Sequence, residues 1–453
     1  MKGKEAGLFD NKALASLILP LLVEQFLAVL VGMADSIMVA SVGEAAVSGV
    51  SLVDNVMVLF INLFAALATG GAVIAGQYLG QEDRKSSGKA ATQLIWFMTA
   101  VSFGIMVLIY LGKNFILHQI FGATEADVCA HANTYLLIVA ASVPFLAIYN
   151  GGAAIFRTMG NSGVSMKVSV IMNAINCGGN ALLIYGLHCG TEGVAIPTLL
   201  SRAVAAVLIV ILLSRTRGSI RIERSLHIKF DGRMIRRILG IGLPNGMENS
   251  MFQLGKIMVL SLVSTFGTSA IAANAVSNAV AQFQILPGMA INLAVTAVIA
   301  RCIGAGRYDQ AEYYTKKLVL LVYFCHITVN ICIWLALPLI LKVYNLSPET
   351  ADTARQILHF HGICASIVWP VAFTLPCTLR AAGDAKVTMY ISIASMWFCR
   401  IVMSYVLGKY LGMGVFGVWV AMIFDWCVRF VAMTFRYRQG KWKQIDSLAK
   451  IVL

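Results

Sequence analysis

Two halves of the chain repeat one pattern of residues, about 224 positions apart. The matched features are Pro20 and Pro244, Glu24 and Glu248, and the six-residue segments at 156–161 (FRTMGN) and 379–384 (LRAAGD). Each half also holds six long apolar stretches, so the halves are expected to fold alike and to enter a membrane in the same orientation. A duplicated bundle with a cleft along its pseudo-twofold axis is typical of transporters that open to each side in turn.

The apolar stretches are long enough to cross a bilayer, which takes about 20 residues of helix. Hydrophobic residues make up 59% of the chain and charged residues 12%, which excludes a soluble globular protein. The predicted spans are 13–39, 46–79, 91–112, 129–155, 164–186, 193–213, 238–265, 270–300, 316–341, 354–378, 387–408 and 414–435. This pattern predicts an all-α integral membrane protein with twelve transmembrane helices in two pseudo-symmetric six-helix lobes. The lobes would be 1–218 and 238–453, joined by a basic linker at 219–237.

Positive charge is concentrated on one side of the predicted spans. With the N-terminus placed in the cytoplasm, 27 of the 35 Lys and Arg residues lie on the cytoplasmic side and four on the opposite side. This bias predicts cytoplasmic termini in a multi-pass protein of the cell membrane. The net charge of +14 is therefore explained by topology, with anionic lipid head groups as partners and no nucleic acid.

The sequence shows no sign of an enzyme. It contains no phosphate-binding loop of the G-x-x-x-x-G-K-[ST] type, and its cysteines, histidines and carboxylates form no metal-binding or nucleophile pattern. We therefore predict no catalytic residues, no metal site and no cofactor other than a coupling ion, and we expect a monomer.

Ionisable residues inside the spans are candidate sites, because charge at membrane depth is costly. They are Glu24, Asp35, Asp54, Arg202, Glu248, Lys256, Arg400, Asp425 and Arg429. Asp425 and Arg429 stand at i and i+4 and are interpreted as a structural ion pair. Arg202 and Arg400 are interpreted as packing residues.

Asp35 and Asp54 form the strongest candidate pair. Asp35 shares a helix face with Glu24, about 16 Å further along the axis, and the turn near 43–44 places Asp54 level with Asp35 on the next helix. Two carboxylates at one depth repel unless they share a proton or a cation, which predicts a coupling-ion site. The second half has Val259 and Asn278 at these positions, so the paired acids belong to the first half alone.

Glu24 and Glu248 are matched by the repeat, which favours a position lining a shared substrate cleft. The alternative is a hydrogen-bonded carboxyl at a helix contact. Lys256 is the third candidate for this cleft. It lies eight residues after Glu248 and is placed to neutralise it along one helix face.

The chain resembles the multidrug and toxic compound extrusion (MATE) family over nearly its whole length. Besides the twelve spans in two lobes, the resemblance rests on residues 32–39 (GMADSIMV), 77–80 (QYLG), 303–306 (IGAG) and the Arg-containing turns at 157 and 380. Members of that family are secondary antiporters that export cationic amphipathic compounds in exchange for H⁺ or Na⁺.

The resemblance also implies site residues. The family's helix-1 aspartate falls on Asp35, the paired polar positions of helix 5 on Asn176 and Asn180, and the helix-6 threonine on Thr198. Where some members have aspartate, this chain has Asn180, and Asp54 would supply the missing charge. The helix-10 acid of one branch is absent, since that stretch reads Val368-Trp369-Pro370, which favours coupling through the first lobe.

These observations predict an antiporter that exports cationic drugs or metabolites in exchange for H⁺ or Na⁺ by alternating access. A flippase for a lipid-linked or polysaccharide precursor is the first alternative, but it would need several basic residues in the cleft. A channel or receptor without coupled transport is the second, but it would need polar residues along a continuous pore, and here they gather in one lobe.

Overall fold

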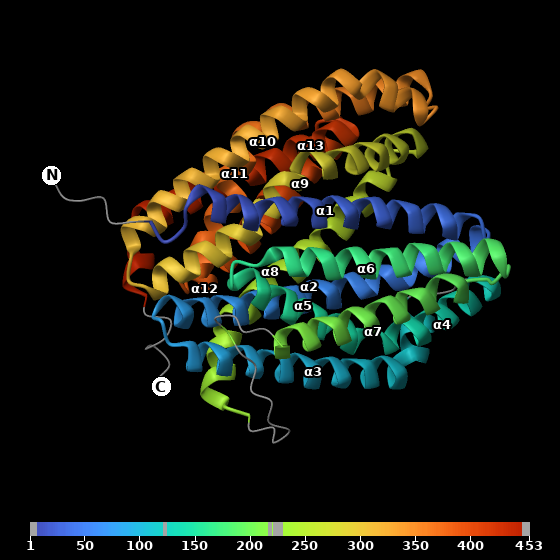
Figure 1. Cartoon of the computed structure of the whole chain (residues 1–453). Coiled ribbons are helices and arrows are strands. Elements are labelled where there is room, and N and C mark those ends of the chain that lie inside the picture. The colour runs from blue at the N-terminus through green and yellow to red at the C-terminus, as the bar shows by residue number, and fades with distance from the viewer. Residues whose placement is uncertain (1–6, 121–124, 216–219, 221–229, 446–453) are drawn as a thin grey trace. The chain divides into compact units, whose positions relative to one another are not determined.

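The computed structural model describes residues 7–120, 125–215, 220 and 230–445, which form helices throughout (Figure 1). In these segments no strand occurs. The α-helices are α1 (Asn11–Ala40), α2 (Glu44–Gly80), α3 (Arg84–Phe115), α4 (Ala126–Ala141), α5 (Val143–Thr158), α6 (Ser162–Ala181), α7 (Glu192–Arg215), α8 (Gly232–Ser264), α9 (Thr268–Gly304), α10 (Tyr308–Val343), α11 (Pro348–Ala381), α12 (Ala385–Ala394) and α13 (Gly414–Arg438). Short π-helical segments are η1 (Ile116–Ile120), η2 (Leu182–Gly186), η3 (Ser395–Ile401) and η4 (Ser404–Tyr410), and η5 (Lys441–Gln444) is a 3₁₀ turn.

Helical residues cover each of the twelve predicted spans, which confirms the predicted fold class. In the described residues, ten helices are long and apolar enough to cross a membrane. The pair α4 and α5, bent by 45°, makes an eleventh if it is one span. The seventh predicted span, 238–265, falls on α8, which is 33 residues long. It is not among these helices, because Glu248 and Lys256 interrupt its apolar stretch.

The repeat in the sequence is also a repeat in local structure. Helices α2 and α9 each contain 37 residues and begin 224 positions apart. Each follows a glycine with positive φ, 142° at Gly43 and 97° at Gly267. Side chains with a Cβ avoid this conformation, so the glycine allows the sharp turn between successive antiparallel spans. The same backbone solution is therefore used at matched positions in both halves.

The described residues divide into two compact units. The first is Phe9–Gly246, and the second consists of the described residues before Phe9 and those from Met247 onward. In the first unit α1 packs on α6, α6 on α7, and α2 on α3, α4 and α5. In the second unit α11 contacts both α9 and α13, and α10 contacts α9. The division falls inside α8. Most of the predicted linker, including residues 221–229, lies outside the described residues, so the predicted lobe boundaries stay a prediction.

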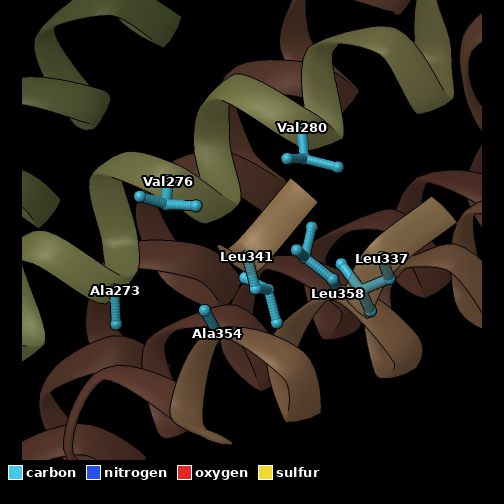
Figure 2. Packing of buried hydrophobic residues seen from close by; sticks show 7 residues of the cluster. All are labelled: Ala273, Val276, Val280, Leu337, Leu341, Ala354 and Leu358. Carbon is cyan, nitrogen blue, oxygen red and sulfur yellow. The ribbon is translucent and has the colours of Figure 1, made fainter. Parts of the chain in front are cut away.

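Branched and small apolar residues form the interior of the second unit, where α9, α10 and α11 meet (Figure 2). The cluster consists of Ala273, Val276, Val280, Leu337, Leu341, Ala354 and Leu358, all nearly inaccessible. Alanine at 273 and 354 lets the helices approach closely, while the leucines fill the space between them. This packing holds the scaffold on which the polar residues of the second unit are placed.

The first turn of α8 is held against α3 outside the apolar region. The Lys89 ammonium donates to Asp231 at 2.5 Å, and the backbone N–H groups of Arg233 and Met234 donate to the same side chain. These donors, the Lys89 hydrogen bond first, hold the pKa of Asp231 below its usual range. Asp231 therefore caps α8 and joins it to α3.

Glycines mark the closest helix contacts of the first unit. A Cβ on Gly70 of α2 would lie 2.5 Å from the backbone oxygen of Ile238 on α8. Because that neighbour is backbone and cannot turn aside, the two helices would have to separate to admit a methyl group.

We expect Gly70→Ala to lower the stability of the purified protein by about 1–3 kcal/mol, the usual cost of overpacking. Gly104→Ala on α3 is the matched control, since a Cβ there meets nothing within 4 Å. Thermal unfolding in one detergent should separate the two variants. Equal midpoints would show that the contact between α2 and α8 is looser than described.

Candidate functional site

Four of the predicted coupling residues come together in the first unit. Asp35 is half-buried on α1, and the Asn180 amide on α6 donates to its Oδ1 at 2.7 Å. Asn176, one turn before Asn180, lies between Asp35 and Thr198 of α7. The site forms because α6 packs on both α1 and α7, and because residues four apart share one face of a helix.

The Asn176 amide fits this site in two orientations. In one, its nitrogen donates to both carboxylate oxygens of Asp35, at 3.0 and 3.1 Å, while its oxygen accepts from Thr198 Oγ1 at 3.1 Å. In the other, the nitrogen donates to Thr198 Oγ1 at 3.1 Å and the Thr198 hydroxyl donates to the Val194 carbonyl at 2.8 Å. The second orientation turns the amide oxygen toward Asp35, which suits a carboxyl that carries a proton.

Asp54 lies near this group without bonding to it. It is on α2, and the Tyr135 hydroxyl of α4 donates to its Oδ1 at 3.1 Å. The negative charge of Asp54 acts electrostatically on Asp35, as expected from the prediction that the two acids lie at the same depth. The structure therefore brings all five predicted residues into one region, with Asp54 at its edge.

Arg202 of α7 is a member of this region that the sequence interpretation assigned to packing. Its guanidinium donates to Ser142 Oγ at 2.7 Å and lies within electrostatic reach of both Asp35 and Asp54. Within the described segments neither acid forms an ion pair with it. One cation thus faces two acids at intermediate range, which leaves the region able to accept a further positive charge. The intramembrane arginine was visible in the sequence, but the fold was needed to place it.

A wide turn follows the site on α6. The π-helical segment η2 begins two residues after Asn180. Such turns leave backbone groups less tightly bonded and often occur at functional positions. The Asn180 Oδ1 atom is buried without a hydrogen-bond partner among the described residues, so it is an oxygen ligand available beside the Asp35 carboxylate.

Glu24 and Glu248 are related by the repeat but have different partners. Glu24 is 7% exposed and accepts from Ser165 Oγ at 3.1 Å. Glu248 instead forms an ion pair with Arg380, whose Nη1 donates to Glu248 Oε2 at 3.0 Å. The interpretation that Lys256 neutralises Glu248 was therefore wrong. Arg157 is the repeat partner of Arg380, and its Nε donates to the Ala153 carbonyl. The halves therefore share carboxylate positions while differing in how each charge is balanced.

Lys256 lies elsewhere in the second unit, with Nζ 5.1 Å from the centre of the Phe252 ring. The predicted pair of Asp425 and Arg429 is confirmed, with Nε donating to Oδ1 at 3.0 Å between two buried side chains. Ser395 Oγ also donates to Asp425. No pattern in the sequence pointed to that serine, because the contact joins residues 30 positions apart.

The chain matches known transporters over nearly all of its length. A family model described as MatE matches twice, at residues 20–182 and 244–406. The uncharacterized transporter YisQ of Bacillus subtilis is 26% identical over 441 residues, covering 95% of each protein. The probable multidrug resistance protein NorM of Thermotoga maritima is 25% identical over 447 residues, covering 97% of this chain and 95% of the relative.

Solved structures show the same fold. A MATE transporter in the bent conformation superposes with a TM-score of 0.86 at 20% identity, covering 96% of both chains. An outward-facing multidrug resistance MATE family transporter of the MOP superfamily superposes with a TM-score of 0.89 at 19% identity, covering 96% of this chain and 97% of the other. The fold is thus retained although about four residues in five differ.

Proposed function

The chain belongs to the MatE family of membrane transporters, and from this premise we propose that it is an antiporter that exports cationic amphipathic drugs or metabolites in exchange for H⁺ or Na⁺. It is a transporter and not an enzyme, and its substrates are small molecules. The proposed exchange rests on one observation about Asp35. Its carboxylate accepts from amide groups and forms no ion pair with a described residue. A membrane carboxylate without a direct ion-pair partner can take up and release a cation.

In this proposal the orientation of the Asn176 amide depends on whether Asp35 is ionised or protonated. When Asp35 is ionised, the Asn176 nitrogen donates to it and Thr198 donates to the Asn176 oxygen. When Asp35 carries a proton, the amide turns, its oxygen accepts from the carboxyl group, and Thr198 bonds instead to Val194. Each charge state therefore prefers its own set of hydrogen bonds among α1, α6 and α7. A difference of this kind is what allows an ion to bias a conformational equilibrium.

Sodium would use the same region differently. Sodium is a hard cation that prefers oxygen ligands, and the region offers the Asp35 carboxylate and the Asn180 Oδ1 atom, which has no hydrogen-bond partner among the described residues. Asp54 adds a second negative charge nearby, while Arg202 limits the total charge that the region attracts. Either ion would compete with a cationic substrate for the conformations of the transporter, which is the basis of exchange.

The function is tested with purified protein in liposomes. Uptake or efflux of a fluorescent organic cation is followed under a proton gradient alone and under a sodium gradient alone. Antiport predicts accumulation against the substrate gradient with at least one of the two ions, abolished by an ionophore that collapses that gradient. Equilibration without accumulation under both gradients would favour an uncoupled channel instead.

The two repeat-related glutamates should respond differently to loss of charge. We propose that both contribute to a substrate cleft. Glu24→Gln keeps a group that can accept from Ser165, so it should weaken binding of cations with little change in stability. Glu248→Gln leaves the nearly buried Arg380 without its partner, which typically costs about 3–5 kcal/mol when a buried pair is broken.

Binding of a fluorescent cation and thermal unfolding, measured on both variants, separate the two effects. If Glu24→Gln and Glu248→Gln bind every tested cation like the parent, neither residue lines the cleft. An equal loss of stability in the two variants would contradict the difference in their partners.

We also propose cytoplasmic termini in the cell membrane, a lipid-surrounded monomer, and a cytoplasmic position for the basic linker. The support is the bias of 27 against four Lys and Arg residues between the two faces. A cysteine introduced as Arg221→Cys in a chain without other reactive thiols should resist a membrane-impermeant reagent in sealed cells. Glu44→Cys, on the opposite face, should react, because Glu44 is exposed. Reversed labelling would overturn the orientation.

A further inference from the structure

Three cationic side chains gather around one aromatic ring in the second unit. Lys256 Nζ lies 5.1 Å from the centre of the Phe252 ring, Arg400 Cζ 5.3 Å and Arg429 Cζ 5.8 Å. These residues come from α8, η3 and α13, all within the part of the chain after Met247. Each position is well inside a predicted membrane span, so three positive charges stand where charge is costly.

The negative charge nearby balances only one of the three. Asp425 is fully buried and binds Arg429 at 3.0 Å. Lys256 and Arg400 form no ion pair with a described residue, and each repels the other. Asp425 also attracts Arg400 electrostatically. That carboxylate is, however, already paired with Arg429. The cluster of Lys256, Arg400, Arg429 and Asp425 therefore keeps an excess of two positive charges.

Arg400 has a hydrogen-bonding group without a partner. Its side chain is 8% exposed, and its Nε is sealed from solvent with no acceptor in the described structure. A buried donor left unsatisfied is costly, and more so when it is charged. An acceptor from outside the chain would remove this cost and part of the excess charge at the same time.

The helices are shaped to hold this arrangement. Gly255, between Phe252 and Lys256, packs so closely on η3 that a Cβ there would lie 2.2 Å from Met396 Cε. That approach brings α8 against the wide π-helical turn that carries Arg400. Lys256 is exposed and Arg400 is buried, and both lie over the Phe252 ring. The cluster thus has an accessible outer cation, a buried inner cation and an aromatic wall.

We propose that this cluster binds the carboxylate or phosphate group of an amphipathic organic anion, between Lys256 and Arg400, with the apolar part of the ligand against Phe252. Arginine suits an oxyanion because its planar group presents several donors at once. The aromatic wall favours an organic ligand over a small inorganic ion. The site extends the proposed export of cations to anions or zwitterions, and it stands independently of the coupling site at Asp35, which belongs to the other unit.

The test compares an acid with its neutral amide. Binding of 1-naphthaleneacetate and of 1-naphthaleneacetamide is measured by equilibrium dialysis against full-length protein in phosphatidylcholine nanodiscs, with empty nanodiscs as background. We expect the acid to bind at least about ten-fold more tightly than the amide, and Lys256→Gln and Arg400→Gln each to remove about ten-fold of acid affinity, as for a lost charged hydrogen bond. Amide binding should stay unchanged.

Lys317→Gln is the matched control. Lys317 Nζ also lies over an aromatic ring four residues earlier, 5.6 Å from the centre of Tyr313, but it is on α10 and outside the cluster. This variant should bind the acid like the parent. Should Arg400→Gln fail to fold, Lys256→Gln still decides, because its side chain is exposed. Equal binding of acid and amide, or equal effects of Lys256→Gln and Lys317→Gln on acid binding, would overturn the assignment.

A lipid phosphate is the other source of the same chemistry, and native mass spectrometry distinguishes it. The parent and Lys256→Gln are compared after addition of phosphatidylglycerol. A lipid retained by the parent and lost from Lys256→Gln would support the site with a lipid as its occupant. Acid binding in phosphatidylcholine discs without such retention would support a soluble anion. Failure of both measurements would exclude the site while leaving cation antiport untouched.

Discussion

Asp35→Asn is expected to abolish export driven by a proton or sodium gradient, reducing it to the level of liposomes without protein. Asparagine has almost the same shape as aspartate and can still accept from Asn180, whose nitrogen lies 2.7 Å from Asp35 Oδ1. It cannot gain or lose a proton at neutral pH, and it attracts a cation weakly. The fold and the binding of a fluorescent cation should therefore survive while coupling is lost. Transport in liposomes under the two separate gradients measures the effect.

Asp54→Asn is the matched comparison for that variant. Asp54 acts on Asp35 through its charge and bonds instead to Tyr135. Its loss should slow gradient-driven export several-fold without abolishing it. Retained accumulation in Asp35→Asn under both gradients would remove Asp35 from the mechanism. A complete loss in Asp54→Asn alone would move the coupling ion from α1 to α2.

Asp425→Asn is expected to destabilise the second unit strongly. Asp425 is inaccessible and accepts from both Arg429 and Ser395. Removing its charge leaves Lys256, Arg400 and Arg429 around Phe252 with no acid between them in the described structure. Breaking a buried pair on one side costs about 3–5 kcal/mol, which is a large part of the stability of a typical domain. The thermal midpoint of the purified variant should fall sharply, and the yield of folded protein with it.

Two controls separate this effect from the loss of any ion pair. Asp352→Asn breaks the pair with Arg355, whose side chains are 63% and 50% exposed, and it should cost no more than about 1 kcal/mol. The double variant Asp425→Asn with Arg429→Gln also removes the charge that Asp425 balanced, and it should recover part of the loss. If Asp425→Asn unfolds at the same temperature as Asp352→Asn, the buried pair is not a structural element.

The sequence by itself determined the elements and their repetition. Bilayer thickness requires about 20 apolar residues per helix, and a carboxylate or guanidinium inside such a stretch stands out against it. For this reason the order of residues was enough to identify the twelve spans, the matched residues of the two halves, and the intramembrane charges. The pair of Asp425 and Arg429 was also predictable, because residues four apart on a helix always face the same side.

The grouping of Asp35 with Asn176, Asn180 and Thr198 was expected only through the family resemblance, and the roles of these residues stay predictions. No spacing in the sequence joins α1 to α6, which lie 145 positions apart at the contact of Asp35 with Asn180.

Only the tertiary structure decided which charges meet. Glu24 and Glu248 occupy matched positions, yet Glu24 accepts a hydrogen bond from a serine hydroxyl and Glu248 forms an ion pair with an arginine. The sequence interpretation paired Glu248 with Lys256 on the same helix, whereas the fold brings in Arg380 from 132 positions away and turns Lys256 toward Phe252 and Arg400. Periodicity reports which face of a helix a residue occupies, but not which helix packs against that face. The partner of a buried charge is set by that packing.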